Sequence, residues 1–113
     1  MSEVITQGLV ASGKGCEGVV RLVGKVADVF ALMQSGDLGE TILLTESATA
    51  TAVVPLLDRV RGLICTSGGI TSHLAIVSRE FGLPCIMGAE IADPSELDGV
   101  RVLMAADGTI SRV

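Results

Sequence analysis

One segment, Gly62 to Gly88, constrains the fold of this chain more than any other. It opens with the short apolar run Gly62–Cys65, which is typical of a strand buried on both faces. A glycine pair follows, then a stretch with helical periodicity, and then a second apolar run over residues 84–88. A strand, a helix and a strand in this order predict a local α/β unit.

The helix of this unit is predicted over residues 72–81. Leu74, Val77 and Phe81 stand at i, i+3 and i+7, so they share one helical face. Gly82 follows the last periodic residue and a proline comes two residues later. Glycine favours the left-handed conformation that ends a helix and proline cannot continue one, so this pair is a strong C-terminal stop.

The remaining chain predicts mostly strands, with a hairpin turn at Asp107-Gly108. The apolar run 26–32 is ambiguous between strand and helix, whereas residues 46–58 are predicted to be helical with Leu56 and Leu57 on the inner face. Together these elements predict an α/β fold, a mixed sheet layered with one or two helices, in one domain over residues 1–113. The predicted strands cover residues 8–11, 18–23, 41–44, 62–65, 84–88, 100–104 and 109–113.

Composition and charge exclude several classes of protein. Hydrophobic residues make up 49% of the chain but aromatic residues only 2%, so no aromatic set exists for stacking single-stranded bases. The net charge is −5 and the basic residues are scattered, so we expect no nucleic-acid partner. The densest charge is acidic, within residues 90–98, and is expected to be a solvated loop.

The cysteines and the chain start indicate a cytoplasmic protein. Cys16, Cys65 and Cys85 are widely spaced without a CxxC motif, and with one histidine they form no zinc set, so no metal site is expected. Cys65 and Cys85 lie in apolar runs and are expected to be buried. No signal peptide is apparent, and no apolar run approaches the roughly 20 residues of a membrane span.

His73 is the only histidine, and it stands in the first turn of the predicted helix. Thr71 or Ser72 can cap that helix, and the unpaired N–H groups and the positive end of the helix dipole favour an anion there. The same field disfavours imidazolium, which leaves a neutral, nucleophilic ring. Gly68 and Gly69 allow close approach of the backbone, and the hydroxyls of Thr71 and Ser72 can bind phosphate oxygens.

Other interpretations of these residues are open or weaker. By residue type alone, a single histidine near a helix start is most often a surface or structural residue, and Thr71-Ser72 then serves only as a cap. A serine hydrolase is disfavoured because Ser72 and His73 point in different directions and the G-x-S-x-G motif is absent. Gly13-Lys14-Gly15 lacks the spacing of a P-loop, so no ATP site is visible in this chain.

The run from Gly68 to Gly88 resembles the mobile, phosphohistidine domain of the phosphoenolpyruvate-utilising enzymes. This family includes pyruvate phosphate dikinase, phosphoenolpyruvate synthase, enzyme I of the sugar phosphotransferase system and rifampicin phosphotransferase. Its pattern is Gly-Gly-x-Thr-Ser/Cys-His, small and apolar residues, Ala-Arg-Glu, and then Gly-Ile-Pro-apolar-apolar-Gly. This chain carries Gly68 to His73, Ala75 to Glu80 and Gly82 to Gly88 in the same order. Weaker similarity covers residues 39–44, 61–65, 98–102 and 107–110.

The resemblance implies a compact swivelling β/β/α domain that carries phosphoryl groups. His73 matches the histidine that is transiently phosphorylated at one active site and passes the phosphoryl group on at another. The implied partners are a nucleotide-binding, ATP-grasp-like subunit and an acceptor- or phosphoenolpyruvate-binding subunit. Mg²⁺ and ATP or phosphoenolpyruvate are expected on those partners, with no cofactor bound by this chain, which is then one component of a phosphotransferase. The phosphate-binding residues implied beside the histidine are Gly68, Gly69, Thr71 and Ser72.

The chain departs from the family pattern at two places, and the sequence leaves several alternatives open. Cys16-Glu17-Gly18 replaces the family's Ser-Pro-Gly, and Leu74 replaces a small residue, which is expected to alter the docking face. A non-catalytic docking or regulatory subunit that retains the fold is the main alternative, and an excised domain of a longer enzyme is another, against which Met1 and the terminal strand weigh mildly. The acceptor and a regulatory role of Thr71, as in some plant relatives, are left open.

Overall fold

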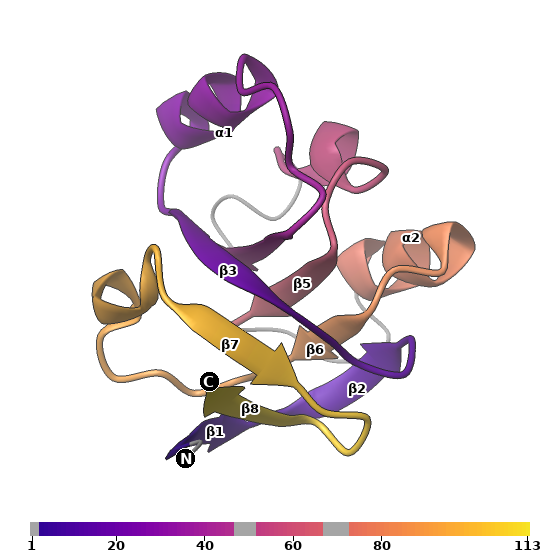
Figure 1. Cartoon of the computed structure of the whole chain (residues 1–113). Helices are drawn as coiled ribbons and strands as arrows, with labels where there is room; N and C mark the ends of the chain where they lie inside the picture. The colour runs from indigo at the N-terminus through magenta and orange to yellow at the C-terminus, as the bar shows by residue number, and fades with distance from the viewer. Residues whose placement is uncertain (1–2, 47–51, 67–72) are drawn as a thin grey trace.

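The computed structural model describes residues 3–46, 52–66 and 73–113. Within them, eight strands form one mixed sheet, with two α-helices and two 3₁₀ helices around it (Figure 1). The predicted α/β fold class is therefore confirmed. The helices are α1 (Val26–Met33), α2 (His73–Phe81), η2 (Val54–Leu56) and η3 (Pro94–Leu97). The strands are β1 (Glu3–Gln7), β2 (Leu9–Ser12), β3 (Cys16–Val23), β4 (Thr41–Thr45), β5 (Gly62–Cys65), β6 (Cys85–Met87), β7 (Arg101–Met104) and β8 (Thr109–Arg112).

The centre of the sheet is parallel and its flanks are antiparallel. The strand order is β1-β8-β7-β3-β4-β5-β6-β2, in which β3, β4, β5 and β6 run parallel to one another. On one side β7, β8 and β1 continue the sheet with antiparallel pairing, and on the other side β2 pairs antiparallel with β6. The two helices α1 and α2 follow β3 and β5, so both begin at the carboxyl ends of parallel strands.

The sheet bends round so that its two outermost strands are continuous in the chain. β1 and β2 stand at opposite ends of the strand order, yet only Gly8 separates them (Figure 1). At this junction the N–H of Gly8 donates to the carbonyl oxygen of Gly108 at 3.0 Å. Gly108 has φ +94°, and a Cβ there would collide with the carbonyl oxygen of Gly8, so this close approach needs glycine. One extended segment thus joins β8 to β6.

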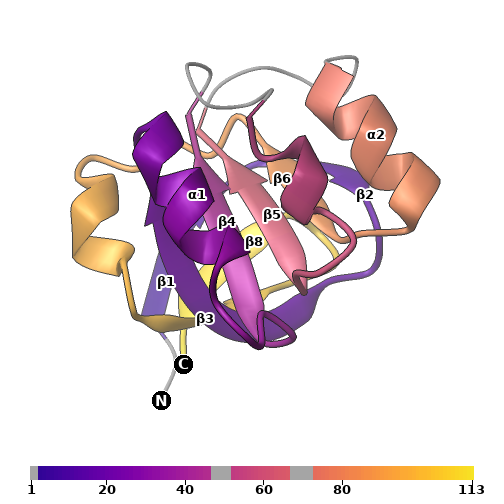
Figure 2. The same cartoon turned by 90° about the horizontal axis from the view of Figure 1, so that it is seen from above.

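Both faces of the central strands are buried, in two separate cores. Ile42, Leu44 and Ile64 lie in the core enclosed by the bent sheet, whereas their neighbours Leu43 and Leu63 lie in the core beneath the helices. Figure 2 shows α1 and α2 over the same face of β4 and β5. Because alternate side chains enter two apolar environments, these strands are continuous apolar runs in the sequence.

Most predicted strands are confirmed, one ambiguous run proves to be a helix, and one strand was not predicted. The strands over 41–44 and 62–65 and the hairpin around Asp107-Gly108 are present as β4, β5 and β7–β8. The ambiguous run 26–32 is helical, as α1. β1 was not predicted, because Glu3–Gln7 has little apolar alternation and is held in the sheet by its pairing with β8.

The helix predicted over residues 46–58 is wrong for the part that the structure describes. Residues 47–51 lie outside the described residues, and residues 52–58 contain only the single 3₁₀ turn η2 and neighbouring turns. Pro55 lies in the first turn of η2, where its missing N–H costs nothing, but it prevents an α-helix from running through this position. Leu56 and Leu57 are nevertheless buried, as predicted for the inner face.

The acidic segment 90–98 is exposed at all four carboxylates, as expected, but two of them also stabilise the fold. Asp98 accepts a hydrogen bond from the backbone N–H of Leu22 at 3.0 Å, and Asp93 accepts one from the backbone N–H of Ser95 at 3.2 Å at the start of η3. None of the helices in the described part of the chain is long and apolar enough to cross a bilayer. A single domain over residues 1–113 and a cytoplasmic location stay predictions.

Candidate functional site

His73 is the first residue of α2 and is exposed to solvent. α2 follows β5, so His73 lies near the carboxyl ends of the parallel strands, where α1 also begins. In open α/β sheets, ligands bind outside this edge, because the loops and helix N-termini there present unpaired N–H groups. The structure therefore places the single imidazole of the chain where an anionic ligand is best received.

The other predicted site residues cannot be placed in the same way. Gly68, Gly69, Thr71 and Ser72, predicted to bind phosphate, lie outside the described residues. Their role stays a prediction. The described residue that precedes them is Thr66, whose backbone N–H donates to the carbonyl oxygen of Thr45 at 3.0 Å. This bond continues the β4–β5 pairing up to the edge of the sheet.

A shallow hollow lies at this edge beside Thr66. Its volume is about 490 Å³, and the described residues that line it are Thr66 and, in the segment after β6, Glu90 to Ala92. The N–H of Ala89 donates to the carbonyl oxygen of Cys65 at 3.1 Å, which holds that segment against the end of β5. The hollow was not predicted, because it depends on how Thr66 and a segment more than 20 residues later meet at the sheet edge.

α2 is held in place by its buried face and by its bonds to β2. Leu74, Ala75 and Ser78 are buried against the sheet. On the flank of the helix, Arg79 donates from Nε to the carbonyl oxygen of Ala11 at 2.8 Å. The helix ends as predicted at Gly82, which has φ +65°. These contacts fix which face of α2 turns outward, and with it the orientation of the helix that carries the histidine.

Two expectations about this helix are corrected by its packing. Phe81, predicted to share one helical face with Leu74 and Val77, is 52% exposed while Leu74 is buried. The reason is that the buried face is centred on Leu74, Ala75 and Ser78 and leaves the end of the helix outside. Leu74 was expected to alter the docking face, but it is only 3% exposed and lies in the core beneath the helices. Its extra volume is absorbed inward, away from His73.

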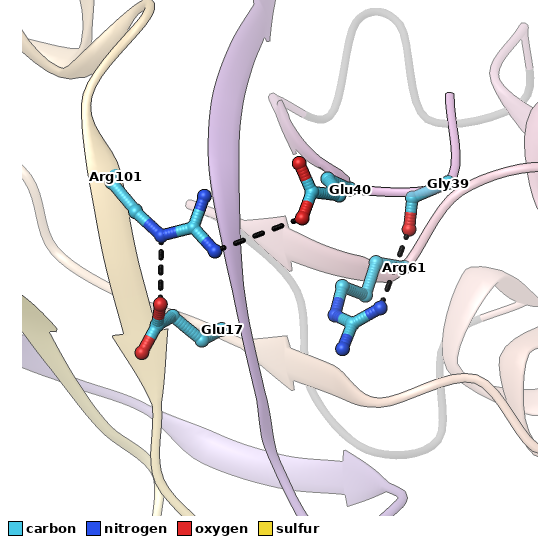
Figure 3. Close-up of polar contacts among 5 residues, drawn as sticks. All are labelled: Glu17, Gly39, Glu40, Arg61 and Arg101. Atoms are coloured by element: carbon cyan, nitrogen blue, oxygen red, sulfur yellow. Dashed lines mark hydrogen bonds and ion pairs between the residues drawn. The ribbon is translucent and has the colours of Figure 1, made fainter. Parts of the chain in front are cut away.

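The main charged cluster lies at the opposite edge of the sheet. Arg101 pairs with Glu17 at 2.7 Å and approaches Glu40 at 3.8 Å, and Arg61 donates to the carbonyl oxygen of Gly39 at 3.5 Å (Figure 3). Hydrogen bonding to Glu17 raises the pKa of Arg101. Glu17, Glu40 and Arg61 lie at or just before the amino ends of β3, β4 and β5. Arg101 begins β7 and stands opposite Val19 of β3, so the cluster lies at the edge opposite to the one that carries His73.

One departure from the family pattern, at Cys16-Glu17-Gly18, lies in this cluster. Glu17 stands where the family pattern has proline, and its carboxylate is the partner of Arg101. Cys16, which replaces the serine, is partly buried with Sγ 3.8 Å from Sδ of Met104. The departure therefore affects the packing of β3 on β7 at the amino edge and does not touch the first turn of α2.

The two cysteines in apolar runs are buried beneath α2, as predicted. Burial raises the pKa of the Cys85 thiol to about 11. Its Sγ lies 3.5 Å from Sδ of Met87. These thiols are core residues. Within residues 3–46, 52–66 and 73–113, no group of three or more histidine, cysteine or acidic side chains is arranged to hold a metal ion.

Comparison with known proteins identifies the family. Residues 38–109 match the mobile domain of the PEP-utilising enzymes. This match covers more than half of the chain, including β4 to β7, α2 and the histidine. The chain belongs to the family of PEP-utilising enzyme mobile domains, and the resemblance drawn from the Gly68–Gly88 motif is confirmed.

Individual relatives agree with this assignment. The chain is 36% identical over 109 residues to the phosphoenolpyruvate synthase of Pyrococcus furiosus, which covers 96% of this chain and 12% of that protein. It is 38% identical over 104 residues to a pyruvate kinase of Staphylococcus haemolyticus, covering 89% of this chain and 17% of that protein. This chain thus spans only a small fraction of the length of these relatives.

A solved structure supports the same fold. The N-terminal domain of Enzyme 1 – Nitrogen superposes with a TM-score of 0.54 at 31% sequence identity, covering 71% of this chain and 34% of that chain. The likeness is consistent with a compact α/β domain carrying α2 on one side of its sheet. Sequence motif, family match and fold therefore agree.

Proposed function

We propose that this chain is a phosphoryl carrier, transiently phosphorylated on His73, that passes the phosphoryl group between the active sites of partner proteins. The observation that carries the proposal is the exposed position of His73 at the start of α2, at the carboxyl edge of the sheet, in a member of the PEP-utilising mobile-domain family. Exposure lets a second protein reach the ring, and the fixed helix determines the direction of approach.

The proposed chemistry is a pair of phosphoryl transfers. A neutral ring nitrogen of His73 attacks the donor phosphorus, a P–N bond forms, and the P–O bond to the leaving nucleotide or enolate breaks with its electron pair going to that leaving group. In the second step an acceptor oxygen attacks, the P–N bond breaks and the imidazole is regenerated. The N-terminal dipole of α2 stabilises the added negative charge. Gly68, Gly69, Thr71 and Ser72 are proposed to contact the phosphate.

The proposed partners are a nucleotide-binding, ATP-grasp-like subunit and an acceptor- or phosphoenolpyruvate-binding subunit. Support comes from the phosphoenolpyruvate synthase relative, in which the matching region is 12% of the protein, so most of that enzyme lies outside it. Mg²⁺ is proposed to act in the partners' sites, where it neutralises the transferring phosphoryl group. The chain is then one component of a dikinase- or synthase-like phosphotransferase.

Labelling with isotopic phosphate tests the proposal. The purified chain is incubated with candidate partner subunits and either ATP labelled at its β- or γ-phosphate or labelled phosphoenolpyruvate. We expect an acid-labile, alkali-stable label on the wild-type chain that is lost in His73→Ala. His73→Ala is expected to fold, because the side chain is exposed. A label that persists in His73→Ala refutes the site.

The alternative is a docking or regulatory subunit that keeps the fold. The match within a pyruvate kinase favours this alternative, because a pyruvate kinase is neither a dikinase nor a synthase. The same experiment separates the two hypotheses. A docking subunit predicts partner binding that is unaffected by His73→Ala, together with no acid-labile label from any donor.

A further inference from the structure

Three sulfur-bearing side chains lie together in the core beneath α2. Cys65, Cys85 and Met87 are each at most 2% exposed and belong to the same buried cluster. In the parallel pairing of β5 with β6, Ile64 stands opposite Ile86. The next step of this register places Cys65 opposite Met87, on strands about 4.8 Å apart. We call Cys65, Cys85 and Met87 the sulfur cluster.

The thiol proton of Cys85 lies between two of these sulfur atoms. Sγ of Cys85 donates to Sδ of Met87, and the two sulfurs are 3.5 Å apart. Two sulfur ligands that each stand about 2.3 Å from one ion, at an angle of about 100°, have nearly the same separation. The two side chains therefore already hold the spacing of a pair of metal ligands, and an ion can replace the proton with little movement of either.

Ser78 provides an independent sign of a missing ligand. Its side chain is fully buried on α2, and among the described residues its Oγ has no hydrogen-bond partner. A buried hydroxyl without a partner costs free energy, so most buried hydroxyls have one. Burial dominates the pKa of the Cys85 thiol, and Ser78 and Cys65 both lie close enough to influence it. The unpaired hydroxyl thus stands beside a sulfur whose own proton is directed at Met87.

We propose that the sulfur cluster binds one monovalent thiophilic metal ion, Cu(I), and that Ser78 donates a hydrogen bond to the ligating sulfur of Cys85. The S–H bond of Cys85 breaks and its proton leaves to solvent. The ion binds the resulting thiolate, the thioether of Met87 and the sulfur of Cys65, and no electron is transferred. Soft sulfur ligands of this kind select Cu(I). The thiolate is a strong acceptor, so the hydroxyl of Ser78 gains the partner that it lacks.

The charge balance of this exchange suits an apolar core. Burial disfavours a bare thiolate at Cys85, but one monovalent ion in place of one proton leaves the charge of the core unchanged. Zn²⁺ fits this site poorly. It prefers four ligands where the cluster offers three sulfurs, and its second charge would require Cys65 to lose a proton as well. The ligands and the charge therefore both favour Cu(I).

Competition with the chelator bicinchoninate tests the site. The reduced full-length chain is mixed, without oxygen, with the coloured complex of Cu(I) and bicinchoninate, and the loss of visible absorbance measures transfer of Cu(I) to the protein. Because the sulfurs are buried, entry of the ion needs local opening around α2, so the absorbance is followed until it is constant. We expect one Cu(I) per chain and, in weakly buffered solution, the release of one proton per ion.

Four variants locate the bound ion. Cys85→Ala removes the thiolate and should lower the affinity for Cu(I) at least about 100-fold. Met87→Leu keeps the volume and the apolar character of the core and should lower it about tenfold or more. Ser78→Ala removes only the hydrogen bond to the ligand and should lower it about tenfold. Cys16→Ala is the matched control, because Sγ of Cys16 also lies beside a methionine sulfur, 3.8 Å from Sδ of Met104. It should stay within about twofold of the wild type.

Circular dichroism first establishes that each variant is folded. Failure of the wild-type chain to take Cu(I) from bicinchoninate overturns the proposal, and so does binding that is lost in Cys16→Ala. If Cys85→Ala does not fold, Met87→Leu decides the question, because a wild-type affinity in that variant also overturns the site. The experiment uses the chain without any phosphoryl donor, so its outcome is independent of the proposed carrier function.

Discussion

Arg79 donates its Nε–H to the carbonyl oxygen of Ala11 at 2.8 Å and thereby joins the helix that carries His73 to strand β2. A second contact, from the hydroxyl of Ser12 to the carbonyl oxygen of Ser78 at 3.5 Å, lies beside it. Because β2 is the second half of the segment that joins β8 to β6, these bonds connect the closure of the sheet with the placement of α2.

Replacing Arg79 is expected to loosen this connection. In Arg79→Met the carbonyl of Ala11 loses a charged donor, and we expect the free energy of unfolding to fall by about 1–2 kcal/mol. Urea denaturation followed by circular dichroism measures the change. Glu80→Gln on the neighbouring, outward position is the control and should change stability by less than about 0.5 kcal/mol. Equal stabilities of Arg79→Met and the control would show that the bond contributes nothing.

Truncating Leu74 is expected to destabilise the domain strongly. The side chain is 3% exposed, so Leu74→Ala leaves a cavity beneath α2 and should cost about 2–4 kcal/mol in the free energy of unfolding. Ile76→Ala, two positions along on the exposed face, should cost less than about 1 kcal/mol. Thermal and urea unfolding give both values. A small effect of Leu74→Ala would place this side chain outside the core.

Two glycines with positive φ are expected to respond differently to alanine. At Gly82 a Cβ would meet nothing within 4 Å. Gly82→Ala is therefore expected to lower the free energy of unfolding by only about 1 kcal/mol, because alanine disfavours the left-handed conformation. At Gly108 a Cβ would also collide with the carbonyl oxygen of Gly8, so Gly108→Ala should cost at least about 2 kcal/mol more and disturb the junction of β1 and β2.

Unfolding of the two glycine variants in urea, together with amide exchange in β1 and β2, checks this prediction. Increased exchange confined to Gly108→Ala supports the role of the Gly8–Gly108 contact in closing the sheet. The prediction fails if the two alanine variants are equally stable.

The buried thiol of Cys85 is expected to make stability depend on alkaline pH. Burial raises its pKa from 9.0 to about 11 in the folded protein, so the folded state holds this proton more tightly than the unfolded chain. Its stabilising contribution is therefore complete below about pH 9. It is lost as the pH rises towards 11, at about 1.4 kcal/mol per pH unit.

Comparison with Cys85→Ala isolates this effect, because the variant removes the titrating group and keeps every other one. The difference in the free energy of unfolding between the two proteins, measured by urea denaturation from pH 8 to 11, is expected to shift in favour of the variant as the pH rises. A difference that is constant with pH would show that Cys85 does not titrate differently on unfolding.

Much of the fold follows from local sequence. The apolar runs of β4 and β5 predict strands because both of their faces are buried, and Gly82 predicts the end of α2 because it supplies a positive φ. The helix expected over residues 46–58 fails in its described part, where Pro55 permits a 3₁₀ turn only. Propensity was outweighed there by a single missing backbone donor.

The candidate site, like the fold, was predicted from the sequence only in part. His73 was found from its position at a helix start within the Gly68–Gly88 motif, a signal carried by consecutive residues. The inward direction of Leu74 and the exposure of Phe81 were not predictable, because they depend on which face of α2 meets the sheet. The hollow beside Thr66 was not predictable either, because it depends on how Thr66 and the segment after β6 meet at the sheet edge. The buried face of α2 is set by a hydrogen bond to β2, which is distant in sequence, and by packing in the core that α2 shares with β6.

The sequence by itself determined the class of this protein, its strand-rich α/β character and its single histidine, because motifs, turns and helix stops are properties of neighbouring residues. Only the tertiary structure decided that β1 and β2 close the sheet and that His73, Ile76 and Glu80 share the outward face of α2. The physical reason is that hydrogen bonding between distant strands and burial of one helical face are collective choices, made when the whole chain packs.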